Sequence, residues 1–252
     1  MQQSNTYIIV FSAILTVIIG GLMSLTSVLL KPRQDQQVEL DTKKKILGAV
    51  MDISSYTEPA DILALYAERV ESVVVDINGD PVEMDAKGNP MIAEKVNIQR
   101  NYKIEPAERL YPVFKFREDP AGEVTAYVLP MFGAGLWDWI SCFIAIEGDL
   151  NTIKGIAFDH KGETPGLGAR IASEEVQSRF VGKKLFEAGE LVSVVMLKGE
   201  GNPGLSDHEV DGMSGATITA KGVNKMIENY MKLYEDFIEK QKESSNVAYN
   251  IQ

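Results

Sequence analysis

The sequence predicts an α+β fold with a mixed or antiparallel sheet and flanking helices, preceded by a single N-terminal transmembrane helix. Three observations lead to this prediction: an uncharged apolar run near the start, several short strand-like runs separated by glycine and proline, and a strongly periodic helix near the end. The chain has 252 residues, of which 45% are apolar and 24% charged, as in ordinary globular proteins. We therefore expect one sizeable domain with accessory segments.

The apolar run covers residues 7–30 and contains no charged side chain. A helix needs about 20 such residues to cross a bilayer, so the run is long enough. A cleaved signal peptide would have a basic start and small residues at a cleavage site. The tail of residues 1–6 has neither Lys nor Arg, and no such site follows. We therefore expect an uncleaved anchor at residues 7–30.

Basic residues follow this anchor and none precede it, among them Lys31 and Arg33. The positive-inside rule, taken alone, would place the large domain in the cytoplasm. A single short anchor with an almost uncharged start tests that rule poorly, so the orientation stays open on charge alone.

Residues 31–110 are expected to form a membrane-proximal helical and mixed segment. We expect Pro32 to end the membrane helix, an amphipathic helix at residues 36–50, a second helix at residues 61–70 and a strand at residues 72–77. Residues 80–109 have no clear pattern.

Residues 111–252 are expected to form the main domain. Its predicted strands are at residues 112–116, 124–129, 142–147, 153–158 and 191–197. A helix at residues 173–181 would begin with Ser173 as its N-cap, and apolar residues at helical spacing predict a long C-terminal helix at residues 220–242.

Composition excludes several functions. The net charge of −11 disfavours binding to nucleic acid, because the surface would repel phosphates. Cys142 is the only cysteine, which excludes an internal disulfide, a zinc ribbon and an iron–sulfur cluster. His160 and His208 are the only histidines, and no well-placed nucleophile accompanies them. We predict neither a catalytic residue nor a metal site.

The first candidate motif is Asp-Gly-Met-Ser-Gly-Ala-Thr-Ile-Thr, residues 211–219, immediately before the C-terminal helix. We expect Thr219 to be the N-cap of that helix, which puts Thr217 at the entrance. Unpaired N–H groups and the helix dipole favour an anion there. The alternative is an ordinary loop that only caps a helix. The spacing matches neither a P-loop nor a Rossmann fingerprint.

The second candidate motif is Glu-Thr-Pro-Gly-Leu-Gly, residues 163–168. Its proline and glycines permit a sharp turn with close backbone approach to a flat group. Thr164 could donate a hydrogen bond to that group, and Leu167 could form an apolar wall. The alternative is a simple β-turn before the helix at Ser173.

Together these motifs resemble those of the FMN-binding subunits of bacterial ion-motive redox complexes, and most closely the NqrC family of the sodium-translocating NADH:quinone oxidoreductase. The resemblance covers nearly the whole chain: the anchor, the helix around Leu47, Gly135-Leu136-Trp137, residues 143–171, Gly182-Lys183 and Ser-Gly-Ala-Thr. The RnfG family of the related Rnf complex shares both motifs but usually lacks the Gly-Leu-Trp sequence.

The resemblance implies that Thr217 is esterified by the phosphate of FMN and that residues 111–252 are an FMN-binding domain. A separate flavin transferase would make this bond outside the cytoplasm, taking FMN from FAD. Recognition by the transferase and the phosphate pocket would involve Asp211, Ser214, Gly215 and Ala216. Thr219 has the right chemistry, but the family pattern places the ester two residues earlier.

The resemblance also implies that the 163–168 loop lies against the isoalloxazine ring, with Thr164 and Leu167 in contact. Trp137 is either a neighbour of the flavin or a core residue, and Glu163 either holds the loop or tunes the flavin. The chain would relay electrons between the other membrane subunits of its complex, in the bacterial inner membrane with the flavin domain on the periplasmic side. The alternatives are a flavoprotein of the RnfG type and a membrane-anchored scaffold or ligand-binding domain without redox activity.

Overall fold

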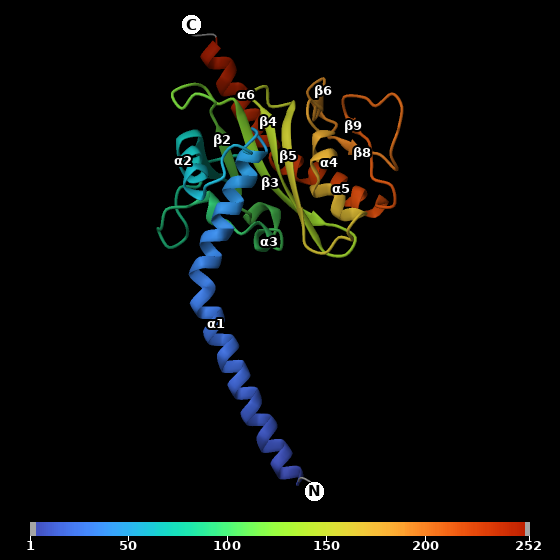
Figure 1. Cartoon of the computed structure of the whole chain (residues 1–252). Helices are drawn as coiled ribbons and strands as arrows, with labels where there is room; N and C mark the ends of the chain where they lie inside the picture. Colours follow the sequence, from blue (N-terminus) through green and yellow to red (C-terminus); the bar gives the residue numbers. More distant parts are fainter. Residues whose placement is uncertain (1–3, 250–252) are drawn as a thin grey trace. The chain divides into compact units, whose positions relative to one another are not determined.

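The computed structural model describes residues 4–249, with side chains up to residue 244. It divides into two compact units, Met1–Thr42 and Lys43–Gln252, and the second contains all the strands that the structure describes. Figure 1 gives the element labels used below.

Helix α1 (Asn5–Gly48) contains the apolar run and is the only described helix long and apolar enough to cross a membrane. The hydroxyls of Thr16 and Thr26 donate to carbonyls one turn earlier, so these polar groups are satisfied within the helix. The prediction that Pro32 ends the membrane helix is wrong, because α1 continues through it to Gly48. Proline removes one backbone hydrogen bond, and good helix formers on both sides maintain the helix.

The main sheet is antiparallel throughout, with its strands in chain order. Its strands are β1 (Val70–Val75), β2 (Tyr111–Phe116), β3 (Ala126–Ala134), β4 (Trp139–Glu147) and β5 (Ile153–His160). Since β1 pairs with β2, the chain on either side of the predicted boundary at residue 110 shares one sheet. The α+β fold class predicted from the sequence is confirmed.

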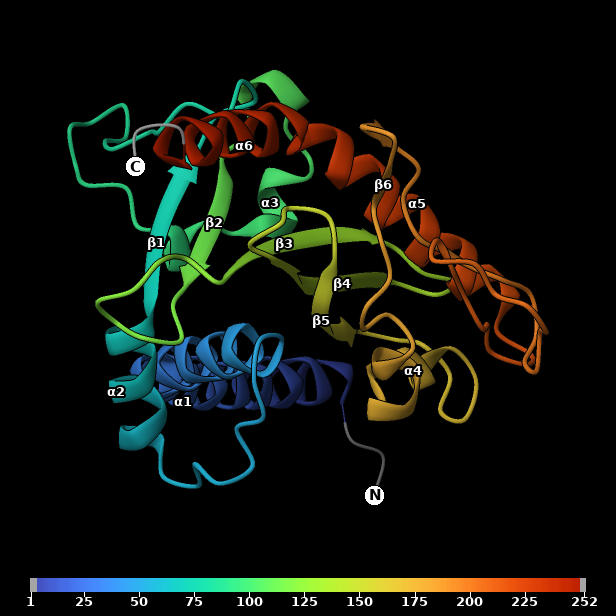
Figure 2. The same cartoon turned by 90° about the horizontal axis from the view of Figure 1, so that it is seen from above.

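Helices α5 (Thr217–Leu233) and α6 (Glu235–Tyr249) lie along one face of this sheet, as Figure 2 shows. Side chains that alternate along the strands form the core on this face, including Leu129, Cys142 and Ile144. The predicted single helix at residues 220–242 is wrong at one point, because it is interrupted at Tyr234. The buried Tyr234 hydroxyl donates to the carbonyl of Pro112 at 2.9 Å, which fixes the break against the sheet.

The other face of the sheet is covered in part by the end of α1 and the residues after it. Ile46 and Leu47 are fully buried. A Cβ atom on Gly155 of β5 would overlap the Ala49 carbonyl, so glycine is needed for this close approach. Lys45 and Asp159 form an ion pair at 2.6 Å on the same face. Helix α2 (Pro59–Arg69) precedes β1, as the sequence predicts for residues 61–70.

The remaining elements are short. They are η1 (Ala93–Lys95), α3 (Ile98–Asn101), η2 (Pro106–Glu108), η3 (Gly168–Ala172), α4 (Glu174–Ser178), β6 (Phe186–Glu187), β7 (Glu190–Leu191), β8 (Val195–Met196) and β9 (Glu209–Val210). Ser173 is the N-cap of α4, as predicted, and accepts a hydrogen bond from the Val176 amide. The predicted strand at residues 191–197 is wrong, because Ser193 has a φ of 65° and divides it into two short strands.

Candidate functional site

A buried carboxylate joins the two motifs to a third segment. Glu163 is only 4% exposed. One of its oxygens accepts hydrogen bonds from the backbone amides of Leu136 at 2.8 Å and Trp137 at 3.0 Å. The other accepts from the Thr219 hydroxyl at 2.5 Å. Three donors compensate for the desolvation of the carboxylate. Glu163 therefore fixes the Gly-Leu-Trp loop and the first turn of α5 relative to its own loop.

Two glycines allow the backbone to approach this carboxylate closely. A Cβ atom on Gly135 or on Gly168 would overlap the carboxylate of Glu163. Of the glycines in the 163–168 motif, only Gly166 has the positive φ, 75°, that a sharp turn requires. The two glycines of the motif therefore have different tasks, one in the turn and one against Glu163.

Trp137 lies at the surface, with 69% of its side chain exposed, so it is not a core residue. Its indole Nε1 donates to the Thr164 hydroxyl at 3.2 Å. This contact brings together two of the residues that we expected beside a flat cofactor. The Thr164 hydroxyl accepts this hydrogen bond and keeps its own proton available for another partner.

Leu167 connects the 163–168 loop with the loop before α5. Its Cδ2 atom lies 2.8 Å from the position that a Cβ atom on Gly215 would take. Gly215 also has a φ of 77°, so both its backbone conformation and the leucine contact favour glycine. The Leu167 side chain remains 42% exposed, which leaves it available as an apolar wall.

Thr217 is the first residue of α5, and Ala216 occupies the N-cap position without a side-chain cap. The prediction that Thr219 is the N-cap is therefore wrong. Thr219 is already the third helical residue, and its hydroxyl donates to Glu163. The half-buried Thr217 has no side-chain hydrogen bond among the described residues. Its hydroxyl lies at the first turn, where the amides lack partners within the helix and favour an anion.

Asp211 shapes the preceding loop and does not hydrogen-bond to the residues around Thr217. Its carboxylate accepts hydrogen bonds from the amide of Gly201 at 2.5 Å and from the amide and side chain of Asn202. The hydrogen bond from Gly201, followed by those from Asn202, lowers the pKa of Asp211. At neutral pH the ionised carboxylate therefore holds residues 201 and 202 in place.

A charged network next to the site was not identified from the sequence. Arg170 contacts Glu200 at 2.6 Å, and Arg179 contacts Glu175 at 2.6 Å. The Arg170 guanidinium, as the strongest contribution, lowers the pKa of Glu200, and a hydrogen bond to Ser214 acts in the same direction.

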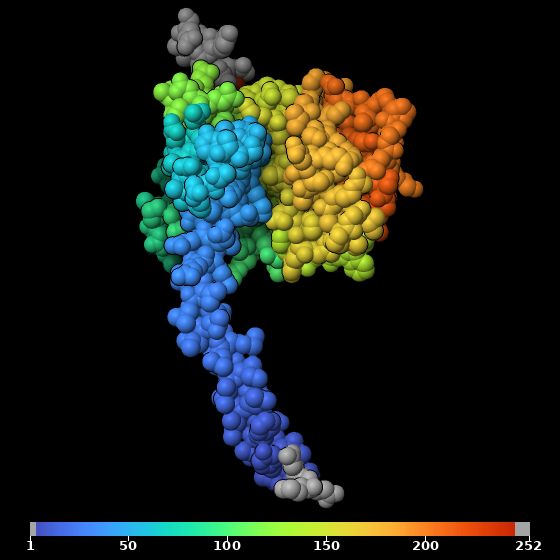
Figure 3. Space-filling model, in the orientation of Figure 1, coloured from blue at the N-terminus to red at the C-terminus, as the bar shows by residue number. Residues whose placement is uncertain are grey.

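Arg179 also donates to the backbone carbonyls of Asp211 and Gly212. This network ties η3 and α4 to the loops before α5, and Figure 3 shows these yellow and orange segments side by side at the surface. Arg170 lies two residues after the 163–168 motif, and this proximity is the only signal in the sequence that could have pointed to it.

The site has the groups that an FMN molecule requires. It offers a hydroxyl without a partner among the described residues at a helix N-terminus, a glycine beside that hydroxyl, and exposed apolar and aromatic side chains from two further loops. These features suit, in turn, a phosphate, a close backbone approach and a flat ring.

Comparisons with known proteins agree with this geometry. The model of the FMN-binding domain family matches residues 135–232, which include all three segments that meet at Glu163. The NqrC protein of the Na(+)-translocating NADH-quinone reductase from Haemophilus ducreyi is 37% identical over 234 residues, covering 87% of this chain and 85% of its own. The corresponding protein from Neisseria meningitidis serogroup A is 36% identical, with coverages of 87% and 86%.

Solved structures show the same similarity. The corresponding protein from Parabacteroides distasonis superposes with a TM-score of 0.69 at 34% identity, over 83% of this chain and 96% of its own. NqrC from Shewanella oneidensis gives a TM-score of 0.69 at 26% identity, over 82% and 98% of the two chains. The chain therefore belongs to the NqrC family of the Na(+)-translocating NADH-quinone reductase, and it contains that family's FMN-binding domain.

Proposed function

We propose that this chain carries one FMN bonded through its phosphate to Thr217, and that it relays electrons between other subunits of a membrane-bound, sodium-translocating NADH:quinone reductase. The observation that carries this proposal is the Thr217 hydroxyl, which lies in the first turn of α5 without a hydrogen-bond partner among the described residues. The alternative hydroxyl, that of Thr219, is buried and already donates to Glu163.

The neighbouring residues support binding of the whole cofactor. The first-turn amides of α5 would hold the phosphate, and Gly215 would let the ribityl chain pass close to the backbone. Trp137, Thr164 and Leu167 would contact the ring, because all three come from loops that Glu163 and Gly215 bring together. The bound flavin would supply the redox chemistry, and the protein would position it.

Asp211, Ser214, Gly215 and Ala216 would form the sequence that a flavin transferase recognises. In the structure Ser214 and Gly215 are exposed and therefore accessible to another protein. Asp211 would contribute indirectly, by fixing the loop at Gly201 and Asn202.

The chain would be anchored by α1 in the bacterial inner membrane, with its flavin domain on the periplasmic side. This orientation follows from the requirement that the domain meet a transferase outside the cytoplasm, and it opposes the basic residues after the apolar run. A cysteine introduced at exposed Glu187 should react with a membrane-impermeant maleimide in intact cells after removal of the outer membrane. Labelling only after lysis would place the domain in the cytoplasm.

The attachment is tested by measuring the intact mass of the full-length chain produced with and without a flavin transferase. We expect a mass increase equal to one FMN minus one water, with flavin fluorescence that survives denaturation. Both should be absent in Thr217→Val, whose side chain has the same shape but lacks the hydroxyl.

Peptide mapping by tandem mass spectrometry should locate the flavin on Thr217 and leave Thr219 unmodified. An unmodified, folded chain in the presence of an active transferase would refute the covalent bond. The chain would then be better described as a membrane-anchored scaffold or ligand-binding protein.

A further inference from the structure

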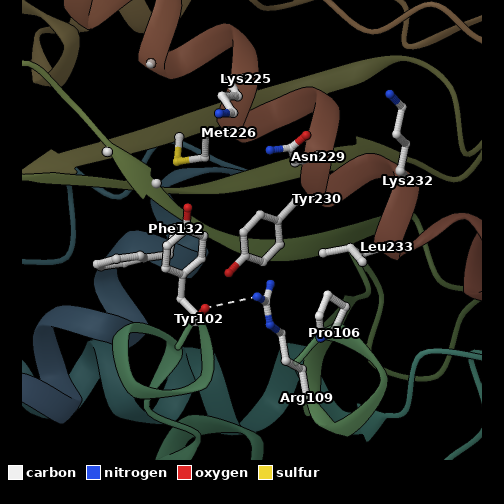
Figure 4. Close-up of a pocket in the computed structure, with 13 residues that line it drawn as sticks. Tyr102, Pro106, Arg109, Phe132, Lys225, Met226, Asn229, Tyr230, Lys232 and Leu233 are labelled. Atoms are coloured by element: carbon white, nitrogen blue, oxygen red, sulfur yellow. Dashed lines mark hydrogen bonds between the residues drawn. The ribbon is translucent and has the colours of Figure 1, made fainter. Parts of the chain in front are cut away.

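A cavity whose lining does not include Thr217 lies along α5. It has a volume of about 540 Å³ and is bounded by α5, the end of β3 and the segment from α3 to η2. Figure 4 shows its lining. None of Glu163, Thr164, Leu167 and Thr217 belongs to this lining. The volume is within the range of small-molecule sites, about 300–1,000 Å³.

The charge of this cavity is opposite to that of the whole chain. Its lining includes Arg109, Lys225 and Lys232 and contains no Asp or Glu, although the chain has a net charge of −11. Lys232 is paired with Glu228 at 2.6 Å. Arg109 and Lys225 form no ion pair with any residue that the structure describes. The cavity therefore has two positive charges that lack a counter-charge in the described part of the chain.

Arg109 is held in a fixed position by its surroundings. Its Nε donates to the Ile104 carbonyl at 2.7 Å, and its Nη2 donates to the Tyr102 carbonyl at 3.0 Å. Its guanidinium carbon lies 5.3 Å from the centre of the Tyr102 ring. The remaining nitrogen, Nη1, makes no hydrogen bond among the described residues and is available to a ligand.

Tyr230 supplies a second independent observation. Its side chain is only 2% exposed, and its buried hydroxyl has no hydrogen-bond partner in the described part of the chain. Figure 4 shows this hydroxyl directed toward the guanidinium of Arg109. Burial raises the pKa of Tyr230, so the hydroxyl is a neutral donor at physiological pH. Buried polar groups nearly always have a partner, so this hydroxyl indicates a missing acceptor.

Most of the remaining lining is apolar, with the Asn229 amide as the polar exception. Phe132 and Met226 are buried side chains that form part of the wall, and Leu233 is a further apolar member of the lining. A ligand that accepted hydrogen bonds from Arg109 and Tyr230 would therefore also place an apolar part against these side chains.

We propose that this cavity binds a small organic carboxylate, with its two oxygens at Arg109 and Tyr230 and its apolar body against Phe132 and Met226, while Lys225 adds positive charge to the cavity wall. One guanidinium N–H and one hydroxyl, side by side, offer two donors to two oxygens. The site is separate from the proposed flavin site and does not depend on covalent FMN.

The test uses ¹⁹F NMR of 4-fluorobenzoate added to the full-length chain in detergent micelles, with micelles alone as the blank. The neutral probe 4-fluorobenzamide has the same shape without the charge. We expect saturable line broadening for the benzoate and at least tenfold weaker binding for the benzamide. Inorganic phosphate should compete poorly. Tight competition by phosphate, equal binding of the two fluorinated probes, or no saturable binding would each overturn the proposal.

Two variants assign the binding to this cavity. Tyr230→Phe removes only an unpaired hydroxyl, so it should fold normally and weaken benzoate binding by about tenfold, the usual effect of a hydrogen bond to a charged group. Lys225→Met should also weaken binding. Lys221→Met is the matched control, since Lys221 is exposed one turn earlier on α5 and does not line the cavity. Unchanged affinity in both cavity variants would overturn the proposal.

A further comparison separates this site from the flavin. Thr217→Val and the flavinylated chain should bind benzoate with the same affinity. If flavinylation abolished binding, the cavity would be part of the flavin site, and the proposal of a separate site would be wrong. If Thr217 carried no flavin at all, the benzoate measurement would still test binding in this cavity.

Discussion

Thr217 and Thr219 are two residues apart and have opposite roles in the structure. The hydroxyl of Thr219 is buried and donates to Glu163, whereas that of Thr217 is half-buried and has no side-chain partner among the described residues. A threonine-to-valine change keeps the side-chain shape and removes only the hydroxyl. The two positions therefore form a matched pair for separating stability from cofactor attachment.

Thr219→Val should lower the free energy of unfolding by about 1–3 kcal/mol, because one oxygen of the buried Glu163 carboxylate would lose its donor. Thr217→Val should change it by less than about 0.5 kcal/mol. Denaturant unfolding of the flavin-free chains measures both values. Equal destabilisation by the two changes would contradict the structural role assigned to Thr219.

Gly168 should be intolerant of any side chain. A Cβ atom there would overlap the carboxylate of Glu163 and lie 2.5 Å from the Thr219 hydroxyl oxygen. Gly168→Ala should therefore lower the free energy of unfolding by about 1–3 kcal/mol, as overpacking does. Gly162→Ala is the control, since its Cβ would make only ordinary contacts, at 3.4 Å and beyond. A Gly168→Ala chain as stable as this control would contradict the close packing around Glu163.

The sequence identified most residues of the candidate site but not how they interact. Glu163, Thr164, Leu167 and Thr217 were selected because they lie in two recognisable motifs. That Glu163 binds the amides of the Gly-Leu-Trp loop could not be predicted, because the contact joins residues 26 and 27 positions apart. Only the folded sheet brings them together.

At the scale of elements, the loop before α5 depends on ionised side chains. Asp211 holds the amides of Gly201 and Asn202, and this bonding lowers its pKa in the folded state. A carboxyl group with a lowered pKa contributes stability above its unfolded pKa, about 3.9. That contribution is lost as the pH falls through the lower, folded pKa.

Asp211→Asn should therefore be less stable than the wild type at pH 7, and the difference should shrink as the pH falls below about 4. Denaturant unfolding at several pH values measures this. A difference between Asp211→Asn and the wild type that stayed constant down to the lowest pH would contradict the role of the carboxylate.

The elements themselves were predicted where local signals agreed with the tertiary structure. The five strands of the main sheet follow from β-branched and apolar runs bounded by glycine and proline. The break at Tyr234 was missed, because the helical spacing of apolar residues continues through it to Ile238. At the break the Tyr234 hydroxyl donates to the Pro112 carbonyl, a tertiary contact that no local pattern shows.

For the whole molecule, the distribution of charge says more about which ligands can bind than the net charge does. The net charge of −11 disfavours nucleic acid as a partner but gives no indication of a cavity with three cationic side chains and no carboxylate. Arg109 and Lys225 are more than one hundred positions apart and meet only in the folded chain. Surface properties of this kind can be obtained only from the structure.

Cys142 lies in β4, between β3 and β5 of the main sheet, and is 2% exposed. Burial raises the pKa of its thiol, so the reactive thiolate is almost absent in the folded chain. Reaction with a thiol reagent therefore requires the sheet to open. The rate of Cys142 modification should fall in proportion to the folding equilibrium constant and rise in Gly168→Ala.

Because Cys142 is the only cysteine of the chain, the rate of thiol alkylation reports how often the domain opens. No probe has to be attached beforehand, because mass spectrometry can follow the uptake of a small alkylating agent by Cys142 itself. A dye attached to any cysteine introduced at the surface would, for the same reason, report that single position without prior removal of the native thiol.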